Sequence, residues 1–541
     1  PSKCRQPLLI LARATQLDRA GELNLADFNA GARQGLQGVG RILELHRRMA
    51  GIEARPQMTQ DLLRALAADD ISYCQWKSTI DLARATSGQS DLDLLVSRAD
   101  QPALLELLGR LGFREADPPP EKAAAGTRSF FGYDPAAPRL IHAHVHYLLM
   151  VGHDLSKGFR LPLEQEFLGS ARQSGHFQVP APELELVAYV IRMVLKRGTL
   201  DSILRGRGRL TKREARELAW LESEADPDQV RQLLNDRDAV VDFQSFSRCR
   251  ESLRPESAPR TLWQCGRDVR DRLAGRSPRS PQSDAGLRLA RIVRYRARKA
   301  SRGKAPRHTP VGGGLVVALV GSDGSGKSTA LQAIEDWLAP DLDVLRAHLG
   351  RPPWSRTTVF VRGGLKAGRM AGRPFRGPAP LASRSGPTSA GSSAPTLTEL
   401  ARFACTARDR NLVYRDITTA AARGRIVLCD RYPLAGLMRM DGPQVGRLLE
   451  GTRAGPLARF IRRREEHYYE PFVAPDLLFV LQIDEDVARN RKPEDDPERV
   501  TRRSREILGI DWSGTGAIVL DASRPAAEIA GEIKQRIWRE I

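Results

Sequence analysis

The chain has 541 residues, 41% of them hydrophobic and 28% charged, and no apolar run approaches the roughly 20 residues that a membrane-spanning helix needs. Its six cysteines are scattered and form no CxxC pair, which excludes a zinc ribbon and a disulfide framework. This length and composition predict a cytoplasmic protein with several domains.

The net charge of +20 comes from two segments. Residues 267–307 hold 14 Lys and Arg against 3 Asp and Glu, and residues 351–395 hold 8 against none, so together they carry 19 of the 20 charges. Both segments are rich in Pro, Gly, Ser and Arg, which is typical of solvated linkers and insertions. The alternative is a surface for an anionic membrane or an acidic partner, and charge confined in this way does not favour nucleic acid. Residues 285–300 have apolar residues at helical spacing, which predicts a basic amphipathic helix.

The pattern along the chain predicts five parts. They are a helical segment at 1–65, a domain of strands and helices at 66–180, a helical domain at 181–275, a basic linker at 276–312, and a second α/β unit at 313–541 with a disordered basic insertion at about 351–396. In the second unit the runs LVVALV, RIVLCD, PDLLFVLQID and GAIVLD predict four strands. The expected fold class is α/β, with a parallel sheet flanked by helices in the second half and an α+β domain followed by helices in the first.

The first half contains the stretch SDLDLLV, in which Asp91 and Asp93 lie two positions apart on a predicted strand. Both carboxylates then project from one face, as two-metal nucleotidyl transfer requires. With the helical stretch behind it, this motif resembles the nucleotidyltransferase superfamily. The resemblance implies a Gly-Ser pair that grips a triphosphate, where this chain has Lys77-Ser78, and a third carboxylate on a later strand, where it has His142, His144 and His146.

Three interpretations of the first half stay open. Asp91, Asp93 and His144 could form a histidine-modified metal site, because imidazole suits several divalent metals. The domain could instead be a degenerate one that binds a nucleotide or a sugar phosphate without chemistry. The third interpretation is a solvated strand end beside an exposed row of histidines.

The second half opens with the phosphate-loop motif G-x-x-x-x-G-K-[ST] between a predicted strand and a predicted helix. Its backbone N–H groups are expected to surround phosphate oxygens, with Lys327 at the β and γ phosphates and Ser328 at Mg²⁺. The predicted nucleotide-binding residues are Gly321, Ser322, Asp323, Gly324, Ser325, Gly326, Lys327, Ser328 and Thr329. The expected cofactors are therefore ATP and Mg²⁺.

The residues after the loop make the similarity more specific. VALVGSDGSGKST, the DRN of residues 409–411, RIVLCDRY and PDLLFVLQID followed by ARNRK resemble the thymidylate kinase family of nucleoside monophosphate kinases, over about 225 residues. The resemblance implies that Asp323 faces the phosphoryl acceptor, that Arg410 clamps the acceptor phosphate, and that Asp430 and Arg431 lie beside metal and acceptor. It also places Arg489, Arg491 and Lys492 in a lid over the transferring phosphoryl group.

The residues that read thymine in that family have no counterpart here, because DRY is followed by PLAGLMRMDGP. The sequence thus predicts an ATP-dependent phosphotransferase acting on a nucleoside monophosphate or another phosphorylated small molecule. Thymidylate kinases are commonly dimers, so a homodimer is a further expectation. Two alternatives remain: a nucleotidyltransferase with a regulatory phosphate-loop domain, and a nucleotide-dependent protein that binds membrane or nucleic acid.

Overall fold

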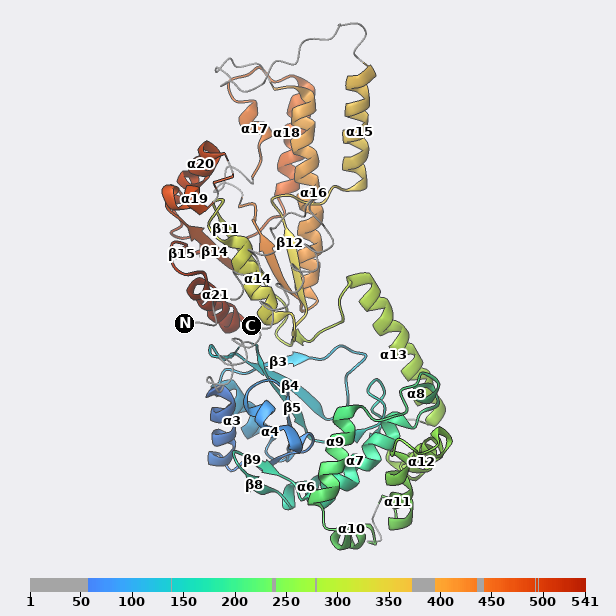
Figure 1. Ribbon diagram of the computed structural model, residues 1–541. Coiled ribbons are helices and arrows are strands. Elements are labelled where there is room, and N and C mark those ends of the chain that lie inside the picture. The colour runs from blue at the N-terminus through green and yellow to red at the C-terminus, as the bar shows by residue number, and fades with distance from the viewer. Residues whose placement is uncertain are drawn as a thin grey trace, which may run out of the picture.

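The computed structural model describes residues 57–541 apart from 138, 236–239, 278–279, 372–394, 435–441, 492 and 495. The predicted helices before residue 57, residues 372–394 of the predicted insertion and Lys492 lie outside the described residues. The first half of the chain forms the lower part of the molecule in Figure 1 and the second half forms the upper part. Within the described ranges, no helix is both long enough and apolar enough to cross a bilayer.

The first half is built on a mixed six-stranded sheet with the order β1-β2-β5-β4-β3-β10. Strands β2 and β5 are parallel, and the other neighbours are antiparallel. Its strands are β1 (Tyr73–Gln75), β2 (Leu92–Val96), β3 (Arg114–Asp117), β4 (Thr127–Gly132), β5 (Ile141–His146) and β10 (Thr309–Pro310). Helices α3 (Gln57–Ala68) and α5 (Gln101–Arg110) bury leucines against this sheet because their apolar residues recur at helical spacing. The remaining helices of this part are short: η1 (Thr79–Asp81), α4 (Leu82–Thr86) and α6 (Glu164–Gly169). Two small antiparallel hairpins complete it. One pairs β6 (Met150–Val151) with β7 (Phe159–Arg160), and the other pairs β8 (Arg172–Ser174) with β9 (Phe177–Val179).

The helical part that follows is organised around α7 (Pro182–Arg197). This helix is apolar on most of its circumference and almost wholly buried, as expected for a central helix. Its neighbours are α8 (Leu200–Leu204), α9 (Lys212–Glu224), α10 (Pro227–Leu234), α11 (Phe243–Ser252) and α12 (Pro259–Arg272), followed by η2 (Ala274–Arg276).

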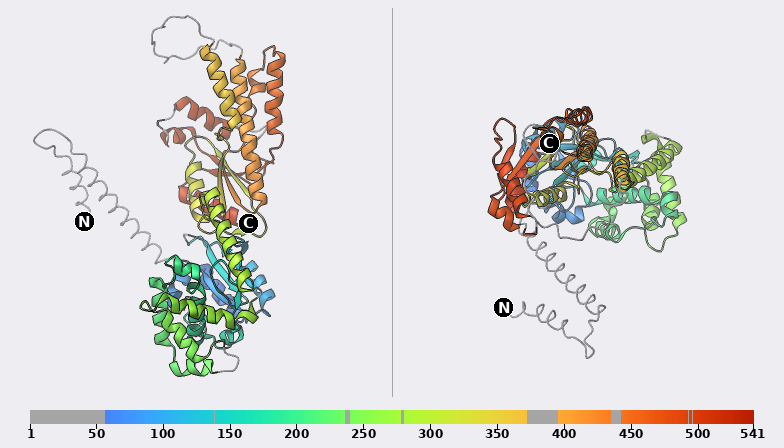
Figure 2. Two further views of the ribbon diagram at one scale, coloured as in Figure 1. Left: turned by 90° about the vertical axis from the view of Figure 1, so that its right-hand side faces the viewer. Right: turned by 90° about the horizontal axis from the view of Figure 1, so that it is seen from above.

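The basic linker contains the helix that was predicted over residues 285–300. Most of it forms α13 (Pro281–Arg302), which is capped by the side chain of Ser280 and leads toward the upper half (Figure 2). The helix is held against the first half because Arg298 pairs with Glu121 at 3.0 Å and Arg288 pairs with Asp201 at 3.2 Å. The linker then supplies β10, the edge strand of the first sheet.

The second half contains a five-stranded, fully parallel sheet with the order β12-β13-β11-β14-β15. Its strands are β11 (Val316–Gly321), β12 (Val344–His348), β13 (Ile426–Asp430), β14 (Leu477–Gln482) and β15 (Ile518–Asp521). Helices α14 (Lys327–Leu338) and α21 (Ala526–Glu540) cover one face, and α16 (Leu397–Ala422) and α20 (Pro497–Leu508) cover the other. The predicted parallel sheet flanked by helices is thus confirmed. The prediction missed β12, because Arg346 and His348 interrupt its sequence VLRAH, which therefore lacks the continuous apolar run of a buried parallel strand.

Helices α15 (Arg356–Ala371), α16 and α18 (Pro456–Tyr469) lie side by side and extend beyond the sheet (Figures 1 and 2). Helix α15 occupies the first part of the predicted insertion, so that part is helical and not disordered. The short α17 (Val445–Leu448) packs on α18, and α19 (Glu485–Arg491) follows β14.

The two halves share a buried contact that involves both aromatic and backbone groups. Tyr133, in the first half, meets Trp337 of α14 edge-on at 4.9 Å between ring centroids, and Trp538 of α21 donates a 3.0 Å hydrogen bond to the carbonyl of Gly112. Phe131 of β4 joins the same hydrophobic cluster as α14 and α21. The phosphate-loop helix therefore rests on the first sheet through its C-terminal end.

Candidate functional site

The phosphate loop joins β11 to α14, and its glycines are required by its tight path. Gly326 has a φ of 85°, which lies in the left-handed region that favours glycine. A Cβ atom on Gly321 would lie 2.6 Å from the carbonyl oxygen of Leu481 and 2.8 Å from Oγ of Ser325, so a side chain cannot be accommodated. Because α14 begins at Lys327, its N-terminal peptide dipoles face the loop and favour an anion there.

Lys327 is buried, and its ammonium group folds back on the loop. Its Nζ donates to the carbonyl oxygens of Gly321 at 3.0 Å and Ser322 at 2.5 Å. Burial and the nearby charge of Arg431 lower the pKa of Lys327 to about 8. A phosphate group would restore a counter-charge to this ammonium.

Asp430 and Arg431 lie at the carboxyl end of β13, next to β11. The Oδ1 atom of Asp430 is buried and has no hydrogen-bond partner among the described residues, whereas its backbone oxygen accepts from Nδ1 of His348 at 3.0 Å. Arg431 has a φ of 64°, a conformation that residues with a side chain rarely adopt. An unsatisfied buried carboxylate oxygen suits a cation, so the residues present fit a divalent metal between Asp430 and Ser328.

Asp323, within the loop, holds two arginines. One of its oxygens accepts from Arg431 at 2.9 Å, and the other pairs with Arg503 of α20. Burial alone would raise the pKa of Asp323, but the ion pairs with Arg503 and Arg431 lower it. The carboxylate is therefore ionised at neutral pH, and two cations are concentrated beside the phosphate loop.

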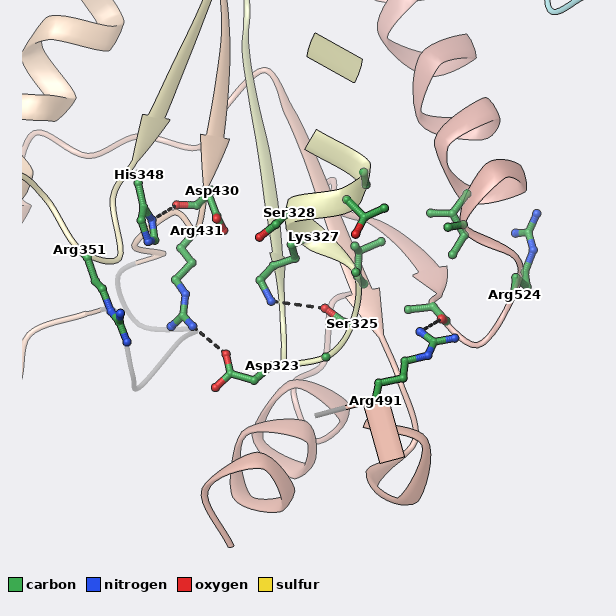
Figure 3. A pocket seen from close by; sticks show the side chains of 18 residues that line it. Asp323, Ser325, Lys327, Ser328, His348, Arg351, Asp430, Arg431, Arg491 and Arg524 are labelled. Atoms are coloured by element: carbon green, nitrogen blue, oxygen red, sulfur yellow. Dashed lines mark hydrogen bonds and ion pairs between the residues drawn. The ribbon is translucent and has the colours of Figure 1, made fainter. Parts of the chain in front are cut away.

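These groups line one cavity of about 640 Å³ (Figure 3). Its charged residues are five cations against two carboxylates, so the cavity favours a polyanion. The side chains drawn around it come from the loop and from the carboxyl ends of the neighbouring strands. They include Asp323, Ser325, Lys327, Ser328, His348, Arg351, Asp430, Arg431, Arg491 and Arg524.

The structure brings most of the predicted residues together, with two exceptions. Arg410 does not line the cavity: its buried guanidinium donates to the carbonyls of Leu349 and Gly350 and to the hydroxyl of Tyr469. It therefore orients the segment after β12 and does not project into the cavity as an acceptor clamp would. Arg489 also lies outside the cavity, where it donates to Oγ1 of Thr501 at 3.3 Å.

Of the predicted lid residues, Arg491 does line the cavity, where it donates to the carbonyl of Ala522 at 2.8 Å. The sequence reasoning missed four other groups at or beside the cavity: His348, Arg351, Arg503 and Arg524. His348 and Arg351 lie at and just after the end of β12, Arg503 lies on α20, and Arg524 follows β15. None of them belongs to a recognisable motif.

The second candidate site lies at the centre of the first sheet, around Asp93. Nζ of Lys77 approaches Oδ1 of Asp93 at 2.7 Å, and the same oxygen lies 3.1 Å from Nδ1 of His144 and 3.5 Å from Nε2 of His146. Although burial would raise the pKa of Asp93, the charge of Lys77 and the histidine hydrogen bonds hold it well below its usual range. Burial lowers the pKa of His144 to about 4 and that of His146 well below its ordinary value, so both rings are neutral at pH 7.

Asp91 and Asp93, which lie two positions apart at the start of β2, contact different histidines of β5. Asp91 pairs with His142 at 3.0 Å, and its side chain is 58% exposed. The ligand atoms that converge within 4.8 Å are those of Asp93, His144 and His146. Such a set could hold a metal ion, although the ammonium group of Lys77 already contacts the carboxylate.

No family model matches the chain, but it is similar to several proteins named for ATP binding. The chain is 28% identical over 225 residues to a protein of Escherichia coli (strain K12) named uncharacterized ATP-binding protein YghS, a match that covers 41% of this chain and 90% of YghS. It is 26% identical over 227 residues to the uncharacterized ATP-binding protein YghR of the same organism, a match that covers 41% of this chain and 86% of YghR.

Proposed function

We propose that the second half is an ATP-dependent phosphotransferase similar to thymidylate kinase. It transfers the γ-phosphate of ATP to a nucleoside monophosphate or another phosphorylated small molecule. The observation that carries the proposal is the single cavity in which the phosphate loop, the unsatisfied oxygen of Asp430 and four arginines meet. The similarity to proteins named for ATP binding supports the nucleotide part of the proposal.

The position of the cavity supports a ligand site. Its residues follow the carboxyl ends of the parallel strands, and the chain order reverses beside β11, where β13 lies on one side and β14 on the other. Ligands of open α/β sheets bind in the crevice outside such a switch point.

The residues then take complementary roles in holding the triphosphate. The loop N–H groups and Lys327 bind its oxygens, and the N-terminus of α14 adds a favourable dipole. Ser328 and Asp430 would hold the Mg²⁺ that accompanies ATP, whose charge offsets that of the phosphate oxygens. Arg431 and Arg491 would stabilise the negative charge that spreads over the phosphoryl group during transfer.

The acceptor side is proposed from charge alone. Arg351 and Arg431 lie on the side of the cavity that faces β12 and β13, away from Arg491 and Arg524 (Figure 3). Two arginines on that side suit an acceptor that itself carries a phosphate group. Arg351 would then bind the acceptor phosphate, which is the role that the resemblance assigned to Arg410.

The proposal is tested by measuring ADP release from ATP with the purified full chain and a panel of nucleoside monophosphates and sugar phosphates. We expect one class of acceptor to stimulate release, and Lys327→Ala to lower it by about 100-fold to 1,000-fold because a preorganised cation is lost. Asp91→Ala is the matched control, because this carboxylate belongs to the first half and should leave the activity unchanged.

Other outcomes separate the alternatives. Loss of activity in Asp91→Ala with retention in Lys327→Ala would favour a nucleotidyltransferase with a regulatory phosphate-loop domain. Absence of transfer to every acceptor, with nucleotide-sensitive binding to anionic vesicles or nucleic acid, would favour the binding-protein alternative.

A further inference from the structure

A second cavity, of about 310 Å³, lies in the first half between the sheet and the helical part. It is formed by the turn after β1, the loop between β6 and β7, helix α7 and the first turns of α9, the elements at the centre of the lower half in Figure 1. Five cationic side chains line it, namely Lys77, Lys157, Arg192, Lys196 and Arg213. Three carboxylates line it as well: Asp154, Glu214 and Glu217.

The carboxylates do not cancel the positive charge of the cavity. Glu214 is bound bidentately by Arg197, at 2.7 and 2.6 Å, and it also caps the start of α9. Glu217 accepts from the backbone N–H of Ser78 at 3.3 Å and pairs with Arg192 at 3.5 Å. Asp154 pairs with Lys196 at 3.5 Å, and Lys196 also lies 3.5 Å from Glu214. All three acidic groups are therefore paired with cations, and the lining keeps five cations against three carboxylates.

Lys157 is the clearest of these donors. No hydrogen bond or ion pair of its ammonium group occurs among the described residues, although the residue is only partly exposed. Burial and the neighbouring charge of Lys77 lower its pKa to about 8, so it remains mostly charged at pH 7. A half-buried ammonium without a counter-ion costs stability, and an anion in the cavity would offset that cost.

The metal chemistry implied by the nucleotidyltransferase resemblance does not fit this site. Two-metal transfer needs two carboxylates that face the same metals, but Asp91 turns to His142 and is mostly exposed. Lys77 projects from the cavity wall to Oδ1 of Asp93, the same oxygen that His144 and His146 approach. The ammonium group of Lys77 thus lies beside Asp93, where the nucleotidyltransferase resemblance implies a metal ion.

We propose that this cavity binds the phosphate or diphosphate group of a small molecule without a divalent metal. Lys77, anchored on Asp93, supplies the charge that a metal ion would otherwise bring, and Lys157 and Lys196 donate directly to the phosphate oxygens. The volume is at the small end of ligand sites, which suits one or two phosphate groups with a small attached moiety. The site is independent of the phosphate loop.

Calorimetric titration with inorganic pyrophosphate in EDTA tests the proposal on the full chain. Lys327→Ala serves as the background, so that the phosphate loop does not contribute. We expect one binding site in this background and about 10- to 100-fold weaker binding after Lys157→Gln, because a charge-assisted hydrogen bond is lost. Lys157→Arg should retain binding, since it keeps the charge.

Lys212→Gln is the matched control, because this lysine is exposed at the start of α9 and does not line the cavity. Without ligand, Lys157→Gln should melt no lower than its parent, the Lys327→Ala background, since Lys157 has no hydrogen-bond or ion-pair partner to lose. Pyrophosphate should raise the melting temperature of this parent but not that of the Lys157→Gln variant. The proposal is overturned if pyrophosphate fails to bind, if binding requires Mg²⁺ or Mn²⁺, or if Lys157→Gln binds as tightly as Lys212→Gln.

Discussion

Replacing Asp323 by Asn should tighten ATP binding, although the residue lies inside the phosphate loop. The Asp323 carboxylate holds Arg431 and Arg503 by ion pairs, and these pairs compete with the binding of phosphate oxygens by both guanidinium groups. The side chains of these arginines are 20% and 21% exposed, so solvent screens each pair. A partly screened pair is worth about 0.5 to 1 kcal/mol.

The two pairs together therefore oppose ATP by about 1 to 2 kcal/mol, which corresponds to about 5- to 30-fold in affinity. Asn keeps the shape of the side chain but has no charge, so Asp323→Asn should lower the dissociation constant of MgATP by this factor. Asp336→Asn removes the same charge from an exposed position on α14 and is the control. Titration of a fluorescent ATP analogue measures both variants. Unchanged or weaker binding by a folded Asp323→Asn would refute the reasoning.

Three further predictions concern stability and pH. Arg410→Ala should lower the free energy of unfolding by about 2 to 4 kcal/mol, because the carbonyls of Leu349 and Gly350 and the hydroxyl of Tyr469 lose their donor. Urea denaturation measures this change, and a loss below about 0.5 kcal/mol would contradict the proposal that Arg410 orients the segment after β12. Trp538→Phe should cost at least about 1 kcal/mol in the same assay, since the hydrogen bond to Gly112 is removed and the smaller ring packs less completely against Trp337. An unchanged midpoint would count against a shared junction. Pyrophosphate binding to the first-half cavity should weaken as pH rises through about 8, because Lys157 then loses its proton. The charged groups around it are Lys77, Arg192, Asp93 and Asp154. The same pH dependence in Lys157→Gln would assign the titration to another group.

The phosphate-loop site was largely predictable from sequence because its central residues are contiguous. Gly321 to Thr329 lie in one run between a buried strand and a helix, and Asp430 ends an equally apolar run. The local sequence pattern is sufficient to predict such a site, since the carboxyl ends of parallel strands meet at one edge of the sheet.

The arginines around that core could not be predicted in the same way. Arg351, Arg503 and Arg524 are three among 85 basic residues, and only the tertiary packing of the loops and α20 brings them to the phosphate loop. Arg410 differs in another way: the resemblance places it at the acceptor phosphate, whereas the structure directs its guanidinium to the carbonyls of Leu349 and Gly350 and to the hydroxyl of Tyr469.

The first half shows how a short element escapes prediction. Asp93 and the alternating histidines of β5 were placed on one sheet correctly, because they lie on strands with clear period-two patterns. Strand β10 is two residues long and includes a proline, so nothing in its sequence indicates that the linker returns to the first sheet.

The contact between α14 and the first sheet limits how the protein can be divided. A fragment that began after the linker would keep the whole phosphate loop, yet it would expose Trp337 and Trp538 and leave the indole N–H of Trp538 without the carbonyl of Gly112. Such a fragment should aggregate or require a solubilising partner, whereas the intact chain should melt in one transition. Loss of the first half by recombination would carry the same penalty unless the side chains at the positions of Trp337 and Trp538 were replaced by polar ones.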